Sequence, residues 1–295
     1  MTRNRDATMK LRSSLSIALI LGVALTAAVR TEAALLLYDG LDYTPIGSDL
    51  TSNNGGSSGG GASWDGAWAV GENNGNPEVT QVIAGGLSYG SLVSEGNASE
   101  DNVGNDSLGN ARPFTGVSTS DGTSLWFSSL IDPTATDNKL YNGWFTNESK
   151  LNGDDGFGWI FEPVNDTSAT ITPYISAEGS ASSVFSYGID DAILVVGRID
   201  FSDTADSDDL RLWIDPTIGG AAPSDASATA SFLGGEFVDG GSFFAVGANN
   251  GGEAVFDEFR LGNTFSDVTP VPEPHSAALL LVAGALLLVR RRRLN

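Results

Sequence analysis

Short apolar runs rich in β-branched and aromatic residues recur along the chain, and clusters of Gly, Asn, Asp and Ser separate them. Runs of this kind are typical of β-strands, and the clusters between them are typical of turns. The clearest predicted strands are residues 124–131, 156–162, 169–176, 190–201, 209–214, 242–247 and 254–261. Between residues 34 and 269 no apolar spacing of three to four residues predicts a long helix, so the pattern indicates an all-β domain.

Two of the predicted strands indicate how the sheets are covered. Leu210 and Leu212 flank Arg211, which is the alternation of a strand with one buried face. Residues 192–196 are apolar at every position, so this strand needs cover on both faces, which a single open sheet does not give. We therefore expect a two-sheet antiparallel jelly-roll sandwich over residues 34–269, with a β-helix as the alternative. The Gly-rich residues 53–61 are predicted to be a flexible surface loop within it.

The first 33 residues have the pattern of a secretory signal peptide. Basic residues open the segment, an apolar stretch follows, and small residues end it. We expect cleavage between Ala33 and Ala34, with a second site after Ala28 and an uncut anchor helix as alternatives.

Residues 270–295 form a tail with three parts. Pro272, Glu273 and Pro274 precede an apolar stretch at 276–289, which is predicted to be a single hydrophobic helix, and the basic end consists of Arg290, Arg291, Arg292 and Arg293. Its thirteen wholly apolar residues, 277–289, rise only about 20 Å, against a hydrocarbon layer of about 30 Å. Arginines favour the cytoplasmic side, so the body is expected outside, in agreement with the signal peptide.

Charge and composition exclude several classes of function. The body, residues 34–272, holds 6 basic and 34 acidic residues, a net charge of −28, so nucleic acid is excluded as a main partner. Such a surface is either simply solvated or bridged to anionic polymers by calcium. The chain has no cysteine, and its single histidine, His275, lies in the tail. An acidic cluster without the EF-hand pattern is predicted to be a hairpin loop; it comprises Asp200, Asp203, Asp206, Asp208 and Asp209.

Catalysis is not indicated, whereas carbohydrate binding stays open. Retaining glycosidases need two carboxylates about 5 to 5.5 Å apart, and no predicted strand offers them on one face. No Gly-x-Ser-x-Gly motif surrounds a serine, so we expect a non-enzyme. Tryptophans stack on sugars, and Trp144, with its polar neighbours, is the best candidate for an exposed platform, whereas Trp126 and Trp159 are expected in the core.

The tail resembles the PEP-CTERM sorting signal of Gram-negative bacteria that make exopolysaccharide. The resemblance covers about 24 residues and rests on Pro272-Glu273-Pro274, the short apolar stretch and the basic end. It implies that an exosortase, a membrane cysteine protease, recognises Glu273 and removes the tail. The alternative is that the tail is never removed and that the same residues anchor the protein permanently in the membrane.

The body resembles laminin-G-like, concanavalin A-like jelly rolls. Three segments carry the resemblance: Leu36-Leu37-Tyr38-Asp39-Gly40-Leu41-Asp42-Tyr43, Trp64-Asp65-Gly66-Ala67-Trp68 and Phe256-Asp257-Glu258-Phe259-Arg260-Leu261-Gly262. It implies a structural calcium held by Asp257, completed by Asp39 or a main-chain carbonyl. A strand period of two places Asp257 on the face of Val255 and Phe259. The alternative is an Asp257 that accepts backbone hydrogen bonds at a strand end.

Together these signals predict an exported, exosortase-sorted surface or extracellular-matrix protein. Its β-sandwich is expected to be non-catalytic and structural or adhesive in an exopolysaccharide setting. The expected partners are the Sec export machinery, the exosortase, the inner membrane before processing, and exopolysaccharide. The alternatives are a carbohydrate-binding module, a tail-anchored membrane protein and a glycan-active enzyme.

Overall fold

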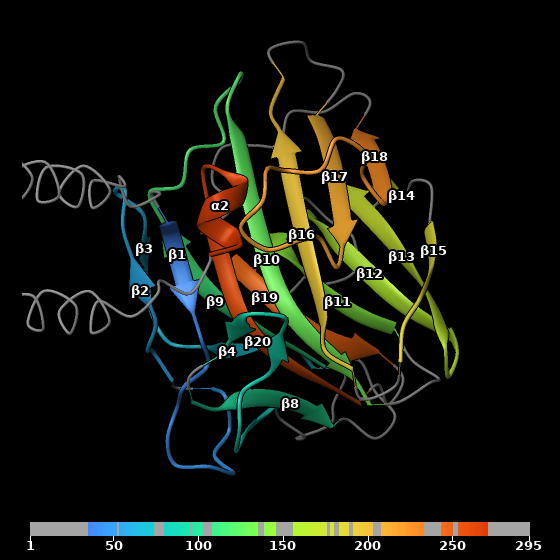
Figure 1. The fold of residues 1–295 in the computed structure, drawn as a ribbon. Helices are drawn as coiled ribbons and strands as arrows, with labels where there is room; N and C mark the ends of the chain where they lie inside the picture. Colours follow the sequence, from blue (N-terminus) through green and yellow to red (C-terminus); the bar gives the residue numbers. More distant parts are fainter. Residues whose placement is uncertain are drawn as a thin grey trace, which may run out of the picture. The chain divides into compact units, whose positions relative to one another are not determined.

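The computed structural model describes most of the body as two β-sheets that face each other (Figure 1). The described residues are 35–51, 53–73, 80–94, 96–102, 108–134, 139–145, 156–175, 178–179, 183–188, 191–202, 208–232, 243–249 and 253–270. All strand pairings among them are antiparallel. The predicted all-β, two-sheet antiparallel sandwich is therefore confirmed.

Sheet 1 contains the strand that the sequence marks as central. Its order is β18 (Ala228–Phe232), β17 (Asp208–Ile214), β16 (Ile193–Asp200), β10 (Ser124–Pro133), β20 (Glu253–Gly262), β1 (Leu35–Asp39) and β2 (Ser57–Ser58). In addition, β8 (Ala98–Asn102) pairs with β20, and β5 (Gln81–Ile83) pairs with β8.

Sheet 2 packs behind it. Its order is β14 (Glu178–Gly179), β13 (Ser168–Ile175), β12 (Gly156–Asn165), β11 (Lys139–Phe145), β19 (Phe243–Asn249), β9 (Leu108–Thr115) and β3 (Ser63–Trp64). In addition, β15 (Ser183–Ser186) pairs with β13, and β4 (Ala69–Asn73) pairs with β9. A small hairpin, β6 (Ser88–Tyr89) with β7 (Leu92–Val93), and the short helix α2 (Phe265–Val268) complete the fold.

The main core lies between the sheets. Sheet 2 contributes Trp159 and Phe161, and sheet 1 contributes Phe256 and Phe259, all of them buried. Burying one such side chain stabilises the fold by about 1.5–3 kcal/mol, so this layer is the main source of stability.

A second apolar cluster covers the outer face of sheet 1. Trp126 and Trp213 stack there with ring centroids 5.1 Å apart, and Phe265 of α2 packs edge-on against Trp126. Leu194 belongs to this outer cluster, whereas Val195 belongs to the main core. The prediction that residues 192–196 are covered on both faces is therefore confirmed. Trp126 is buried as predicted, but on the outer face of sheet 1.

All seven predicted strands are present, as β10, β12, β13, β16, β17, β19 and β20. Residues 53–61 differ in part from the predicted loop, because Ser57 and Ser58 pair with Tyr38 and Leu37 of β1. Of the acidic cluster predicted to be a hairpin loop, Asp200 lies in β16 and Asp208 and Asp209 lie in β17, its antiparallel neighbour, whereas Asp203 and Asp206 lie outside the described residues.

Both ends of the chain lie outside the described residues as well. This applies to the signal-peptide cleavage site, Ala33 and Ala34, and to the sorting motif, Pro272, Glu273, Pro274, Arg290, Arg291, Arg292 and Arg293. Within the described part of the chain, no helix has the length and apolarity needed to cross a bilayer.

Candidate functional site

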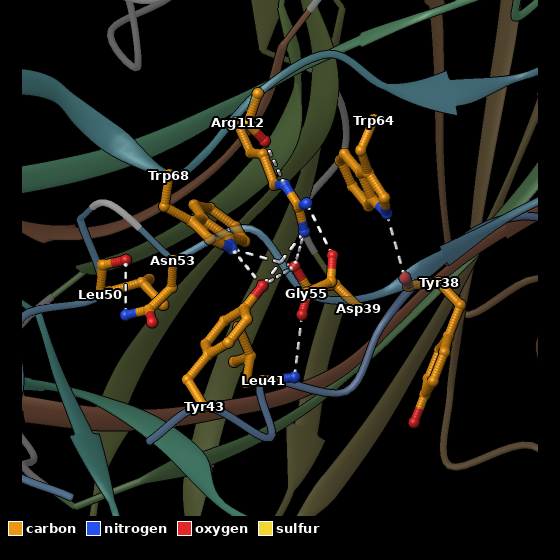
Figure 2. A network of polar contacts seen from close by, with 11 residues as sticks. Tyr38, Asp39, Leu41, Tyr43, Leu50, Asn53, Gly55, Trp64, Trp68 and Arg112 are labelled. Atoms are coloured by element: carbon orange, nitrogen blue, oxygen red, sulfur yellow. Dashed lines mark hydrogen bonds and ion pairs between the residues drawn. The ribbon is translucent and has the colours of Figure 1, made fainter. Parts of the chain in front are cut away.

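A buried ion pair connects the two sheets near one edge of the sandwich (Figure 2). Arg112 projects from β9 of sheet 2, and Asp39 projects from β1 of sheet 1. Each residue is only 1% exposed, and Arg112 Nη1 contacts Asp39 Oδ2 directly. A buried charge is tolerated when it is paired and hydrogen-bonded, so both partners depend on each other.

The Asp39 carboxylate is fully supplied with donors. Its Oδ1 accepts the main-chain N–H of Leu41 at 2.9 Å. Its Oδ2 accepts the Tyr43 hydroxyl at 2.6 Å and the Trp68 indole N–H at 3.0 Å, in addition to Arg112. Burial, followed by the charge of Asp39, raises the pKa of Tyr43, so this hydroxyl stays a donor. The cluster is a rigid, satisfied polar network inside an apolar core.

The remaining donors of Arg112 hold two loops in place. Its Nη2 donates to the carbonyl of Gly55 at 2.7 Å, and its Nε donates to the carbonyl of Gly66 at 3.1 Å. The guanidinium carbon lies 4.4 Å from the centroid of the Trp64 ring, in a cation–π contact. The Trp64 indole N–H donates to the carbonyl of Tyr38 at 3.1 Å, which fixes the plane of the ring.

These loops enclose a polar pocket of about 260 Å³ at the edge where β2 of sheet 1 leads into β3 of sheet 2. It is lined by Asn54, Gly55, Gly56, Ser58, Trp64, Gly66 and Arg112. Gly56 has a φ of +85°, and a Cβ there would lie 2.4 Å from the Tyr38 carbonyl. A glycine is therefore required for the loop to approach Trp64 and Arg112 closely.

The three segments that carry the resemblance of the body meet at this place. The first supplies Asp39 and Tyr43, and the second supplies Trp64 and Trp68. Phe259 of the third segment packs on Trp68 with ring centroids 6.0 Å apart. A half-buried indole, a guanidinium and glycine main-chain groups can bind hydroxyl-bearing molecules. Among the described residues that line the pocket there is no carboxylate and no histidine.

Trp144 is not the exposed platform that the sequence predicts. It is 3% exposed and lies in the main core, with its ring centroid 5.2 Å from Phe114 and 4.7 Å from Phe244. Its polar neighbour Asn142 is buried on the same inward face of β11. Asn142, a polar residue close to Trp144 in the sequence, is therefore buried in strand β11 and is not part of a loop. Trp159 is buried as predicted.

Asp257 shares a face of β20 with Val255, as predicted, but not with Phe259, because β20 contains a β-bulge after Asp257. The register with β10 shifts between Ser128 and Leu130, and Glu258 has a positive φ of 55°. Phe256 and Phe259 therefore both face the core. Asp257 faces the opposite side of sheet 1, where it is 0% exposed beneath the segment that leads into the β6–β7 hairpin.

The surroundings of Asp257 do not fit a calcium ion. Its Oδ2 accepts the N–H of Leu87 at 2.8 Å, and its Oδ1 accepts the N–H of Glu258 at 2.8 Å. Asp39 lies on the other face of sheet 1 and is engaged by Arg112. Among the described residues, no group of three or more His, Asp or Glu is placed to hold a metal ion. Burial raises the pKa of Asp257 to about 7, because the charged carboxylate loses its hydration inside the fold.

A second cavity, of about 470 Å³, lies elsewhere on the body. Its lining includes Tyr187, Asp191 and Asp215. Burial, followed by the charge of Asp191, raises the pKa of Asp215, whose Oδ1 accepts the N–H of Leu194 at 2.9 Å. The lining of this cavity therefore contains two carboxylates, Asp191 and Asp215, which repel each other, whereas the lining of the pocket beside Trp64 contains none.

The sequence did not point to Arg112 or to the pocket. Arg112 is one of six basic residues in the body and stands in a strand beside Pro113. A lone basic residue in a buried strand needs a buried acidic partner. The sequence does not show which of the 34 acidic residues of the body is that partner.

Comparisons with known proteins give a loose likeness of fold. No protein-family model matches the chain, and no curated protein sequence matches it. The globular domain of T. cruzi calreticulin is 12% identical, with 76% of this chain and 95% of that chain covered at a TM-score of 0.44. The β-glucanase of Bacillus licheniformis is 11% identical, with 75% and 99% covered at 0.38. The carbohydrate-binding module CBM66 of Bacillus subtilis is 9% identical, with 66% and 94% covered at 0.34. No ligand or reaction transfers at these identities.

Proposed function

We propose that this chain is an exported, non-catalytic β-sandwich protein of the cell surface or extracellular matrix that adheres to polysaccharide through the pocket beside Trp64. The single observation that carries the adhesive part is the half-buried Trp64 ring, held by Arg112 at the side of a polar pocket. Sugars combine apolar C–H groups with hydroxyls, so an aromatic ring beside main-chain polar groups suits them.

Rigidity of the site supports binding. The pocket walls are hydrogen-bonded to a side chain that is itself buried and paired with Asp39, so little conformational entropy is lost when a ligand enters. The absence of carboxylates from the lining supports a non-catalytic role, because glycoside hydrolysis in most families uses two of them.

The proposal for export and sorting rests on the two ends of the chain. The signal peptide would deliver the body through the Sec machinery, and the tail would hold it in the inner membrane until an exosortase acts at Glu273. Glu273→Ala should leave full-length protein in the membrane. Mass measurement of the mature protein would show this, and cleaved protein in the variant would contradict the sorting proposal.

Retention of the full-length protein on insoluble polysaccharides tests the binding proposal. Ser58→Tyr places a bulky side chain at the pocket and removes no core contact, because Ser58 is exposed on β2. Its control is Ser57→Tyr, which lies one residue away on the other face of the same strand and does not line the pocket.

We expect Ser58→Tyr to lose retention by at least about tenfold, which corresponds to about 1.4 kcal/mol, and Ser57→Tyr to keep it. Trp64→Ala should also lose retention, whereas Tyr89→Ala, which removes a partly buried aromatic ring outside the pocket, should not. Equal retention of all four variants would show that the pocket does not bind glycan.

A further inference from the structure

The charges around the pocket beside Trp64 bear on which polysaccharide it takes, an inference that rests on the proposed function. Arg112 is the only ionisable residue in the lining, and its charge is matched by Asp39, which it contacts directly. A guanidinium has five N–H groups, and four of those of Arg112 are donated to Asp39, Tyr43, Gly55 and Gly66. Among the described residues no protein acceptor is found for the second N–H of Nη2, and Asp39 leaves the guanidinium little net positive charge.

Charges outside the pocket act against anionic polymers. The body carries a net charge of −28, which repels uronate-rich or sulfated chains over about 8 Å at physiological salt. The pocket has no carboxylate of its own through which calcium could bridge to such a chain. The pocket also lacks an acid that could bind the ammonium group of an amino sugar. The nearby Asp39 carboxylate does not serve, because it already accepts hydrogen bonds from four donors.

The polar groups that remain suit hydroxyls. The second Nη2 N–H of Arg112 can donate, and the carbonyls of Gly55 and Gly66 each keep a second lone pair that can accept. The cavity of about 260 Å³ is just below the roughly 300–1,000 Å³ of sites for drug-sized ligands, so it holds about one sugar ring. From this geometry we infer that the pocket takes one sugar unit of an uncharged glycan, and that binding needs neither calcium nor charge attraction.

The test compares three classes of polysaccharide with the full-length protein. A neutral β-glucan, a polyuronate such as alginate and a polyamine such as chitosan are each assayed at about 0.02 M and 0.5 M salt, with and without EDTA. We expect the neutral glucan to be retained with less than about a twofold change between the two salt concentrations and no effect of EDTA. Ser58→Tyr should abolish this retention, and Ser57→Tyr should preserve it.

The outcomes separate the two proposals. Retention of polyuronate that weakens at high salt and is lost in Ser58→Tyr would overturn the preference for uncharged glycans while glycan binding at the pocket stands. Retention that requires calcium and is sensitive to Ser58→Tyr would overturn it as well. If Ser58→Tyr changes no retention of any polymer, the binding proposal itself fails, and salt-sensitive retention of chitosan alone would then reflect only the acidic surface.

Discussion

Replacing Asp39 with Asn tests the buried ion pair most directly, because the side chain keeps its shape and loses its charge. The carboxylate accepts four hydrogen bonds, from Leu41, Tyr43, Trp68 and Arg112. An Asn has one acceptor oxygen, so its amide N–H₂ would face at least one of these donors, and the guanidinium would be left charged and buried. Breaking a buried ion pair from one side costs about 3–5 kcal/mol, and we expect that loss here.

Urea unfolding of four proteins measures the effect: the natural chain, Asp39→Asn, Arg112→Met and the double variant. With a slope of about 3 kcal/mol per molar urea, a loss of about 4 kcal/mol lowers the midpoint by about 1.3 M. The double variant leaves neither charge alone, so its loss should be smaller than the sum of the two single losses by about 1–3 kcal/mol.

The control is an exposed ion pair within sheet 2, the sheet that contains Arg112. Lys139 Nζ lies 3.2 Å from Glu162 Oε2, and both side chains are more than two-fifths exposed. Lys139→Met should therefore cost less than about 1 kcal/mol. If Asp39→Asn costs no more than this control, or if the losses of Asp39→Asn and Arg112→Met add without coupling, the buried pair does not connect the sheets and the reasoning is refuted.

Three further predictions concern Asp257, a structural metal and Trp144, none of which involves the pocket. Because the folded protein keeps the Asp257 proton up to about pH 7 while the unfolded chain releases it near pH 4, stability should fall as pH rises between them, by up to about 4 kcal/mol. The Tm of Asp257→Asn should lack this slope, and an identical slope would exclude the assignment. EDTA should leave the Tm of the natural chain unchanged; a drop would show a structural metal. Trp144→Ala should cost about 3–5 kcal/mol in urea unfolding, and a loss under about 1 kcal/mol would contradict its burial.

The outcomes for single residues show which local patterns were informative. The unbroken apolar run at 192–196 correctly predicted a strand covered on both faces, because each face of a strand must bury its own alternate side chains. The same period of two failed between Asp257 and Phe259, because the bulge at Glu258 shifts the alternation by one residue. Nothing in the residue types around Glu258 marks a bulge, since a positive φ there is set by the pairing with β10 and not by a glycine.

The tryptophans show the same limit in another form. Trp144 shares the inward face of β11 with Leu140, which a period of two indicates, but the intervening Asn142 resembles a residue of a loop. Whether Asn142 and Trp144 face water or the core depends on the strands paired beside them, β12 and β19. Trp64 carried no such signal either, and its contact with Arg112 beside the pocket is seen only in the structure.

The sequence by itself determined the all-β class, seven strands, the excess of acidic residues and the expectation of signals at both ends, because these depend on composition and on neighbours a few residues apart. Only the tertiary structure decided that Arg112 reaches Asp39, 73 residues earlier, and that Arg112 stands at the wall of a pocket beside Trp64. The physical reason is that a buried charge selects its partner by position across two packed sheets, and sequence spacing does not encode which strands face each other.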